Sequence, residues 1–345
     1  VNLSYETPYQ FARRMASLDH LTQGRLGWNI VTGYLDSAER LIGNQGLKAH
    51  DLRYEQADEF LQLCYQFWEG SWQNDAVKIG KQARIFTDPA KVKAIHHQGR
   101  FYQSDGVFQV MPSIQRTPVL FQAGASAKGL AFATQHAEAI FIGGGDKSAI
   151  KRQVETIRQL AKAQGRNPND IKVLMGITVV TDKRHDLAQA KLAEYEGYAS
   201  SEAGLAHYSS SVGIDLSQYA DDEGTAYQQT HRAASANLRF QHQQVTKAQL
   251  IAEHRLGGRY PLIVGDGREV AEALITWVDE TGIDGFNVTR TVTPESYEDF
   301  IQYVIPELQR RGRFKTEYKQ GSLRHKLIGK GERLPSSHPV QSFRC

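Results

Sequence analysis

The feature that most constrains this chain is a regular alternation of short apolar segments with amphipathic helical patterns. Between these segments lie stretches in which apolar residues are three and four positions apart, a spacing typical of amphipathic helices. The clearest of these stretches extends from Tyr54 to Trp68. Because strands that alternate with helices form parallel sheets, the sequence predicts an α/β fold, and a closed barrel needs about three further strands. Five segments have the composition of buried strands: 25–33, 118–124, 139–143, 173–181 and 284–289.

Composition excludes several classes of protein. The 345 residues are enough for a large core, and 41 basic against 38 acidic residues give a net charge of +3, which argues against a nucleic-acid partner. Two cysteines, Cys64 and Cys345, make neither a disulfide framework nor a Cys-based zinc site. With no apolar run of about 18 residues and no signal-peptide pattern, we expect a soluble, cytoplasmic protein without a bound metal.

Three stretches interrupt the alternation. Residues 71–117 are polar and punctuated by glycines, which indicates an excursion from the core. Residues 183–260, rich in Ala, Ser and Tyr with helical periodicity, predict a helical insertion. In a barrel, a segment that follows a strand lies at the C-terminal face, so we expect this insertion to cover the site. Residues 312–345 predict an extended tail that wraps the barrel or a neighbouring molecule.

The sharpest local motif is the passage from a strand into a helix at residues 122–129, QAGASAKG. Small residues at Gly124 and Ala125, the hydroxyl of Ser126 and free N–H groups at a helix start together predict a phosphate-binding corner. The alternative is an ordinary tight turn in which Ser126 is only the N-cap. The dinucleotide fingerprint G-x-G-x-x-G is absent from this motif.

A second group of candidate residues lies near the strand at 25–33. Asn29 is an amide within an apolar strand, where a ligand or a neighbouring strand must satisfy it. Thr32 lies at the C-terminal end of that strand, where barrel enzymes place ligand contacts. Tyr54, at the start of the next helical pattern, can direct its hydroxyl to the same face or belong to the core.

Catalytic histidine and metal motifs are weak in this sequence. Twelve histidines are scattered, and neither H-E-x-x-H nor G-x-S-x-G occurs. His207 lies in the predicted insertion, where a general acid would be useful, although a surface role is the simpler interpretation.

Several longer motifs occur in the order seen in one enzyme superfamily. The chain resembles the flavin-dependent monooxygenases of the bacterial luciferase superfamily, in the branch that includes nitrilotriacetate, long-chain alkane, pristinamycin and dibenzothiophene-sulfone monooxygenases. The motifs that carry this resemblance are GRLGWNIVTG (24–33), LRYEQADEF (52–60), QRTPVLFQAGAS (115–126), SVGIDLS (211–217), DGFNVT (284–289), PELQRRG (306–312) and YKQGSLRHKL (318–327).

The resemblance implies a TIM (β/α)8 barrel that binds reduced FMN supplied by a separate NAD(P)H:flavin reductase. It further implies that O2 and the bound flavin oxygenate a small organic substrate, and a homo-oligomer is expected. Carried over residue by residue, Asn29 contacts the isoalloxazine ring and Tyr54 the phosphate end. Ser126, with the backbone amides of Ala125 and Ser126, binds the phosphate itself.

The chain also departs from the family pattern. The resemblance implies that the five predicted strands correspond to the fourth to eighth of the barrel. We therefore expect the insertion to lie between the seventh and eighth strands and the first three strands to be absent from this sequence. Those strands carry an acidic and a threonine flavin contact and an active-site histidine in relatives. Ser210, Ser211 and Val212 stand where some relatives have a second histidine, which leaves His207 as a possible substitute.

The motifs leave the substrate open but favour a hydrophobic one. They look more like those of the organosulfur members, and the insertion has no evident arginine clamp for a polyanion, so an apolar sulfide or sulfone is expected. Three alternatives stay open: a non-catalytic flavin-binding or assembly protein, a deazaflavin-dependent oxidoreductase of the same superfamily, and an unrelated barrel hydrolase.

Overall fold

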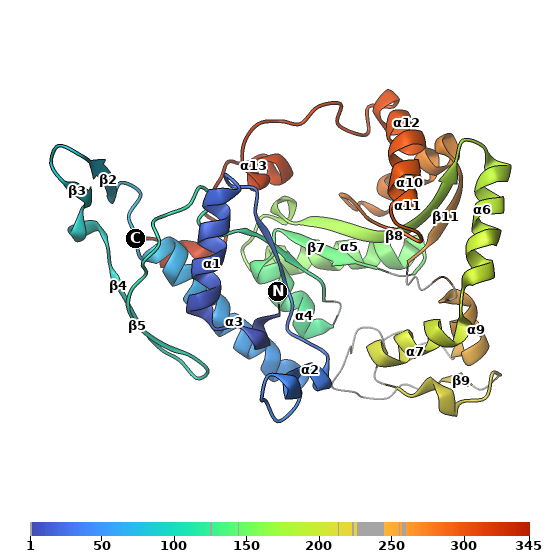
Figure 1. Ribbon diagram of the computed structural model, residues 1–345, viewed down its shortest axis with the longest axis horizontal. Coiled ribbons are helices and arrows are strands. Elements are labelled where there is room, and N and C mark those ends of the chain that lie inside the picture. The colour runs from blue at the N-terminus through green and yellow to red at the C-terminus, as the bar shows by residue number, and fades with distance from the viewer. Residues whose placement is uncertain are drawn as a thin grey trace.

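The centre of the structure is a parallel sheet of six strands (Figure 1). The structure, a computed structural model, describes residues 2–124, 126–143, 145–212, 214–222, 224–225, 245–254, 256 and 260–345. The strand order is β1-β6-β7-β8-β11, and β12 also pairs with β8. The strands are β1 (Gly27–Ile30), β6 (Val119–Gln122), β7 (Ala139–Ile142), β8 (Lys172–Asp182), β11 (Leu262–Asp266) and β12 (Gly285–Thr289).

The sixth strand corrects the sequence analysis, which predicted five. The segment β11 pairs with Thr178–Asp182 of β8, whereas β12 pairs with Leu174–Thr178 of the same strand. Because β8 has 11 residues, its two halves can each hold a different partner. The sequence analysis missed β11 because this strand has only five residues and most of them are half-buried, so it lacks a long run of apolar residues. The predicted insertion therefore lies between β8 and β11.

Helices cover one face of the sheet. Alternate residues of the strands, such as Trp28 and Ile30 in β1, are buried against them, and ring contacts such as Phe11 to Trp28 (4.4 Å) fill the space between. The long helices are α1 (Pro8–Leu21), α3 (His50–Tyr65), α4 (Ala127–His136), α5 (Lys147–Ala163) and α10 (Gly267–Thr281). N-cap side chains stabilise the first turns of α4, α5 and α10. In these helices Ser126, Asp146 and Asp266 accept hydrogen bonds from backbone N–H groups of the first turn.

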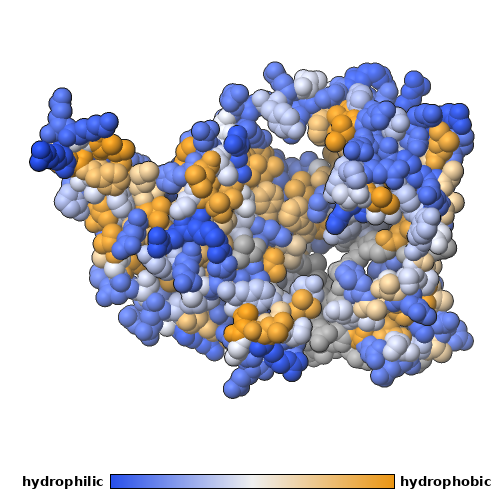
Figure 2. All heavy atoms as spheres, in the orientation of Figure 1, coloured by the Kyte–Doolittle hydropathy of each residue, from blue (hydrophilic) through white to orange (hydrophobic). Residues whose placement is uncertain are grey.

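The other face of the sheet, which we call the inner face, carries the intervening residues. The register places Asn29 beside Phe121, and Phe121 stacks on Phe141 with ring centroids 5.7 Å apart. Leu174 lies in register with Phe141, and Asn287 with Gly176. The three apolar residues are only half-buried and the two asparagines are exposed. Figure 2 shows hydrophobic side chains in the recess near the centre of the view, over the region of β7 and β8.

Residues 71–117, which we call the arm, form the predicted excursion. The arm projects from the body of the molecule as two antiparallel hairpins, at the left of Figure 1. Its first hairpin is made by β2 (Val77–Gly80) and β3 (Ile85–Thr87), and its second by β4 (Ala94–Gln98) and β5 (Gln103–Val107). A π-helical turn, η2 (Gln66–Gly70), leads from α3 into the arm.

The predicted insertion is partly helical. Its first helix, α6 (His185–Tyr198), contacts β8 and β11, and so belongs to the layer around the sheet. The helices α7 (Ser201–Val212) and α9 (Lys247–Glu253) share a small separate core with Tyr208 and Leu250 in it, at the lower right of Figure 1. The short strands β9 (Gly224–Thr225) and β10 (Val245–Thr246) pair beside them.

The last part of the chain returns to the sheet. After β12 come α11 (Glu295–Asp299), the π-turn η7 (Phe300–Val304) and α12 (Ile305–Arg310). In the tail, α13 (Leu323–Ile328) lies against the start of β1, because the Leu323 N–H donates to the Gly24 carbonyl at 2.7 Å. A final turn, η8 (Pro339–Phe343), packs near η2. Minor elements are η1 (Leu3–Tyr5), α2 (Asp36–Leu41), η3 (Pro89–Lys91), η4 (Pro168–Asp170) and η5 (Leu216–Gln218).

Among the helices of the described residues, none combines the length and the apolar character needed to cross a lipid bilayer.

Candidate active site

Four of the predicted site residues meet at one corner of the sheet, where β1 and β6 end. The helix α4 begins there, and the Ser126 hydroxyl accepts the Gly129 N–H at 3.0 Å. The Tyr54 hydroxyl is within hydrogen-bonding reach of Thr32, Gln122 and Ser126. The structure thus brings together residues that are nearly 100 positions apart in the sequence, and we call this group the corner.

The Tyr54 side chain enters the corner from α3. The sequence analysis placed Tyr54 at the start of this helix. The helix in fact begins at His50, so Tyr54 lies in its second turn. Burial raises the pKa of the Tyr54 phenol, although hydrogen bonds to Thr32, Gln122 and Ser126 act to lower it. The hydroxyl therefore stays protonated at neutral pH and remains a hydrogen-bond donor.

Glycines make room for the tyrosine hydroxyl. A Cβ atom on Gly124 would lie 3.0 Å from that oxygen, and one on Gly129 would lie 2.8 Å from it. A contact below 3 Å forces a shift, so a larger residue at Gly129 would push the hydroxyl out of the corner, while a Cβ atom on Gly124 would first meet the Gln122 side chain, at 2.8 Å. Ala125, the remaining predicted contact, lies outside the described residues.

Two corner residues were absent from the predicted site. The His50 Nε2 atom lies 3.3 Å from the Ser126 hydroxyl, while its Nδ1 atom lies 2.8 Å from an Asp51 carboxylate oxygen. Gln122 is buried, and its Oε1 atom has no hydrogen-bond partner among the described residues. Both had a signal in the sequence: His50 is four positions before Tyr54 and so on the same helix face, and Gln122 ends a strand.

The corner fits a phosphate monoester. It offers the hydroxyls of Ser126 and Tyr54, the amide of Gln122 and the first N–H groups of α4, all of which can donate hydrogen bonds to phosphate oxygens. The first turn of α4 has no acidic residue that would repel an anion. The donor set, with two glycines that let the tyrosine hydroxyl approach the start of α4, is therefore suited to the phosphate end of FMN.

Asn29 lies elsewhere, and its environment corrects one expectation. The sequence predicted a buried amide, but Asn29 is exposed on the inner face, while Trp28 and Ile30 on either side are buried under the helices. The segment GWNI is therefore buried on one face only, because side chains of a strand alternate between the two faces of the sheet. This position is compatible with a contact to a ring that lies over the inner face.

His207 is separate from the corner. Its side chain is exposed on α7, a helix that contacts α9 and η5 among the described elements. The proposed role of His207 as a general acid stays a prediction.

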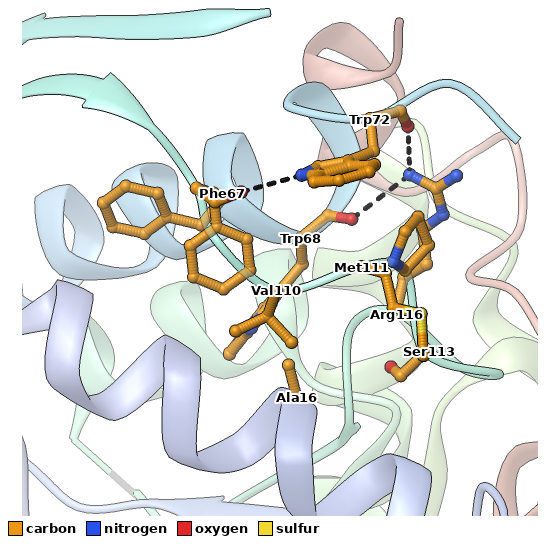
Figure 3. A pocket seen from close by; sticks show the side chains of 10 residues that line it. Ala16, Phe67, Trp68, Trp72, Val110, Met111, Ser113 and Arg116 are labelled. Carbon is orange, nitrogen blue, oxygen red and sulfur yellow. Dashed lines mark hydrogen bonds between the residues drawn. The ribbon is translucent and has the colours of Figure 1, made fainter. Parts of the chain in front are cut away.

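A small pocket lies at the opposite end of the sheet, where the arm joins α1 and η2 (Figure 3). The Trp72 indole N–H donates to the Phe108 carbonyl at 2.8 Å, and the Arg116 guanidinium donates to the Trp72 carbonyl at 2.6 Å. Burial, together with the nearby Arg333, lowers the pKa of Arg116 to about 10, so it keeps its charge at neutral pH. These bonds attach the arm to the body, and the pocket is remote from the strand ends that form the corner. Its lining also includes Ala16, Phe67, Trp68, Val110, Met111, Pro112 and Ser113.

Comparison with known proteins places the chain among flavin enzymes. A sequence profile of the luciferase-like monooxygenases matches residues 1–285. The chain is 44% identical to dimethyl-sulfide monooxygenase of Hyphomicrobium sulfonivorans and 42% identical to long-chain alkane monooxygenase of Geobacillus thermodenitrificans, over 99% of its length in each case. It covers 72% and 74% of those two relatives.

A crystal structure of riboflavin lyase with modified FMN and riboflavin superimposes with a TM-score of 0.94. The sequence identity is 38%, and the match covers 100% of this chain and 77% of the lyase.

Proposed function

The chain belongs to the luciferase-like monooxygenase family, a TIM-barrel family of flavin-dependent oxidoreductases, and from this premise we propose its reaction. We propose that it binds reduced FMN supplied by a separate flavin reductase and uses O2 to oxygenate a small, neutral organic compound. The observation that carries the proposal is the corner, in which Tyr54 and Ser126 meet at the N-terminus of α4 beside two glycines.

In this proposal, the corner holds the phosphate end of FMN. Ser126 and Tyr54 donate their hydroxyl hydrogens to phosphate oxygens, and the first N–H groups of α4 add the favourable end of the helix dipole. Gln122 lies beside the tyrosine hydroxyl, where it acts to lower the pKa of that phenol. His50, held by Asp51 on one ring nitrogen, presents the other nitrogen to Ser126 and can donate from it when that nitrogen carries a proton.

The inner face supports the ring end of the same molecule. Asn29 and Phe121, which are neighbours in register close to the ends of β1 and β6, would contact the flavin ring. Bound reduced FMN supplies the electrons for O2 activation, and the protein supplies binding, orientation and exclusion of water. Residues 183–260 are the proposed cover that keeps this space dry.

The chemistry of the inner face favours a neutral substrate. Most of the residues assigned to it are uncharged, among them Asn29, Phe121, Phe141, Leu174 and Asn287. An aminopolycarboxylate would need cationic partners in a site of low polarity, because unpaired buried charge is costly.

Lys172, a basic residue on the same face, lies at the first position of β8. Its ammonium group is already 3.3 Å from an Asp284 carboxylate oxygen. We therefore propose a sulfide, a sulfone or a similar small hydrophobic compound as substrate.

A binding experiment tests the corner. We expect Ser126→Ala to weaken FMN binding by about 1–2 kcal/mol, the scale of one hydrogen bond to a charged group. Ser322→Ala is the matched control, because Ser322 is also a helix N-cap, at α13, but lies at the other end of the sheet. Equal FMN affinity in the wild type and both variants would contradict the phosphate assignment.

An oxygen-uptake experiment tests the reaction. Reduced FMN is supplied with a sulfide, a sulfone, an alkane and an aminocarboxylate in turn, and oxygenated product is identified by mass spectrometry. Riboflavin belongs in the panel as a second candidate substrate, because the riboflavin lyase structure is so similar to this one. Product formation without reduced flavin would overturn the monooxygenase proposal, and flavin binding without any product would favour a non-catalytic flavin-binding protein.

A further inference from the structure

One aromatic residue lies directly on the backbone of the inner face. A Cβ atom on Gly176 would lie 2.3 Å from the Tyr260 ring, and one on Gly143 would lie 2.4 Å from it. The two glycines are neighbours, because Ile142 of β7 is in register with Met175 of β8 and each glycine follows by one residue. The ring of Tyr260 thus covers a floor of bare backbone that spans two adjacent strands.

This floor lies at the end of the sheet where the corner is. Gly143 immediately follows the last residue of β7, and β7 is the neighbour of β6, whose end forms the corner. The Thr178 N–H donates to the carbonyl of Pro261 at 2.9 Å, which holds the backbone next to Tyr260 against β8. The position of the ring is therefore fixed by both its floor and its backbone.

The opposite end of the inner face is closed in a different way. A Cβ atom on Gly27, the first residue of β1, would lie 2.7 Å from the Phe121 ring and 3.3 Å from the Leu323 side chain of α13. Phe121 and the tail helix thus fill the N-terminal end of the face. Tyr260 is half-buried at the C-terminal end, where (β/α) enzymes build their binding sites.

We propose that Tyr260 is a specificity-determining residue that forms one wall of the substrate pocket and limits the size of the neutral substrates that enter it. This inference rests on the proposed function, since it assigns the space above the inner face to flavin and substrate. The glycines matter because any side chain at Gly143 or Gly176 would lift the ring and narrow the space above it. A small substrate fits beside the ring, whereas a polycyclic one requires the volume that the ring occupies.

The test compares two neutral substrates of different size, dimethyl sulfide and dibenzothiophene sulfone. We expect Tyr260→Ala to raise the ratio of kcat/KM for the larger over the smaller substrate by about tenfold or more, the scale of a changed hydrophobic pocket. Tyr260→Phe should keep the wild-type ratio, because the ring and not the hydroxyl covers the glycines. Tyr198→Ala is the control, since Tyr198 is 85% exposed at the end of α6.

Dissociation constants separate this inference from the proposed function. The Kd values of FMN and of both substrates are measured by titration for every variant, so the comparison does not depend on turnover. If Tyr260→Ala binds FMN as the wild type does but has a higher ratio of kcat/KM for the larger over the smaller substrate, Tyr260 forms a wall of the substrate pocket. An unshifted ratio in Tyr260→Ala, with FMN bound normally, overturns the role of Tyr260 and leaves the proposed function intact. Wild-type protein that binds FMN and the substrates without turnover contradicts the proposed function, while the Kd ratios still decide the role of Tyr260.

A coupled substitution covers the case in which one variant folds poorly. Gly176→Ala should lower the melting temperature and narrow the pocket, because the new methyl group overlaps the ring. The double variant G176A/Y260A should regain most of the lost melting temperature and pocket volume, because the methyl group added at Gly176 then occupies space that the Tyr260 ring has left. Additive effects of the two substitutions on stability and on substrate ratio would show that the ring does not lie on Gly176 and would overturn the inference.

Discussion

The hydroxyl oxygen of Tyr54 occupies the space beside Gly129: a Cβ atom on that glycine would lie only 2.8 Å from it. Tyr54 belongs to α3 and Gly129 to the first turn of α4, so the contact joins two helices at the point where α4 leaves β6. The same hydroxyl reaches Ser126, the N-cap of α4. The two helices therefore position one another and the donors of the corner.

Gly129→Ala tests this contact. The added methyl group must displace the Tyr54 hydroxyl, and we expect FMN affinity to fall by about 1–2 kcal/mol, as for one lost hydrogen bond to a charged group. Fluorescence titration of FMN measures the change. Gly197→Ala in α6 is the control, because no atom lies within 4 Å of the position its Cβ would take. Unaltered FMN affinity in Gly129→Ala would show that the tyrosine hydroxyl is not a ligand.

Asn29→Leu separates a ligand contact from a structural role. Asn29 is exposed on the inner face, so we expect the melting temperature to change little while FMN affinity falls by on the order of 1 kcal/mol. Thermal unfolding and flavin titration are measured on the same samples. Asn287→Leu is the comparison, because Asn287 is also exposed on this face but lies on β12, away from the corner. Loss of stability without loss of flavin binding would assign Asn29 a structural role.

Arg324→Met tests a buried ion pair between the tail and the sheet. The Arg324 guanidinium contacts the Glu138 carboxylate at 2.6 and 2.9 Å, and both side chains are almost fully buried. Removing one partner leaves the other charge unpaired, so we expect a loss of about 3–5 kcal/mol in the free energy of unfolding. The combined variant R324M/E138M should recover part of that loss. If urea unfolding shows that Arg324→Met lowers the free energy of unfolding by less than about 1 kcal/mol, the ion pair is not desolvated.

The buried side chain of His338 should make the stability of the protein fall at acidic pH. Its Nε2 atom donates to the His136 carbonyl at 2.9 Å and its Nδ1 atom accepts the Val340 N–H at 3.1 Å, so the buried ring is neutral. Burial, with Arg166 nearby, holds the pKa of His338 well below its usual 6.5. Burial also lowers the pKa of His136, although Asp58 opposes that shift.

Because the unfolded chain binds these protons more readily, this part of the stability is complete above about pH 6.5. It is lost as the pH falls from there toward the lowered pKa values. We expect His338→Gln to flatten the fall in melting temperature between about pH 7 and pH 5, measured by calorimetry. The same slope in wild type and variant would exclude His338 as its source.

Sequence patterns were most informative where local interactions determine the structure. The spacing of apolar residues predicted α3, and the passage from strand to helix at Ser126 predicted its N-cap, because caps and amphipathic faces depend on residues only three or four positions apart. Periodicity was least informative for β11, a short, half-buried strand that exists because the long strand β8 offers it a second pairing segment.

The sequence by itself determined the parallel α/β plan, through the spacing of its apolar residues, and the family, through motifs that resemble those of its members. Only the tertiary structure decided that Asn29 faces away from the helices, that His50 and Gln122 join Ser126, and that Tyr260 lies over Gly143 and Gly176. Those relationships depend on strand register and on which segments pack together. Both are settled by contacts between residues far apart in the sequence, which no local pattern records.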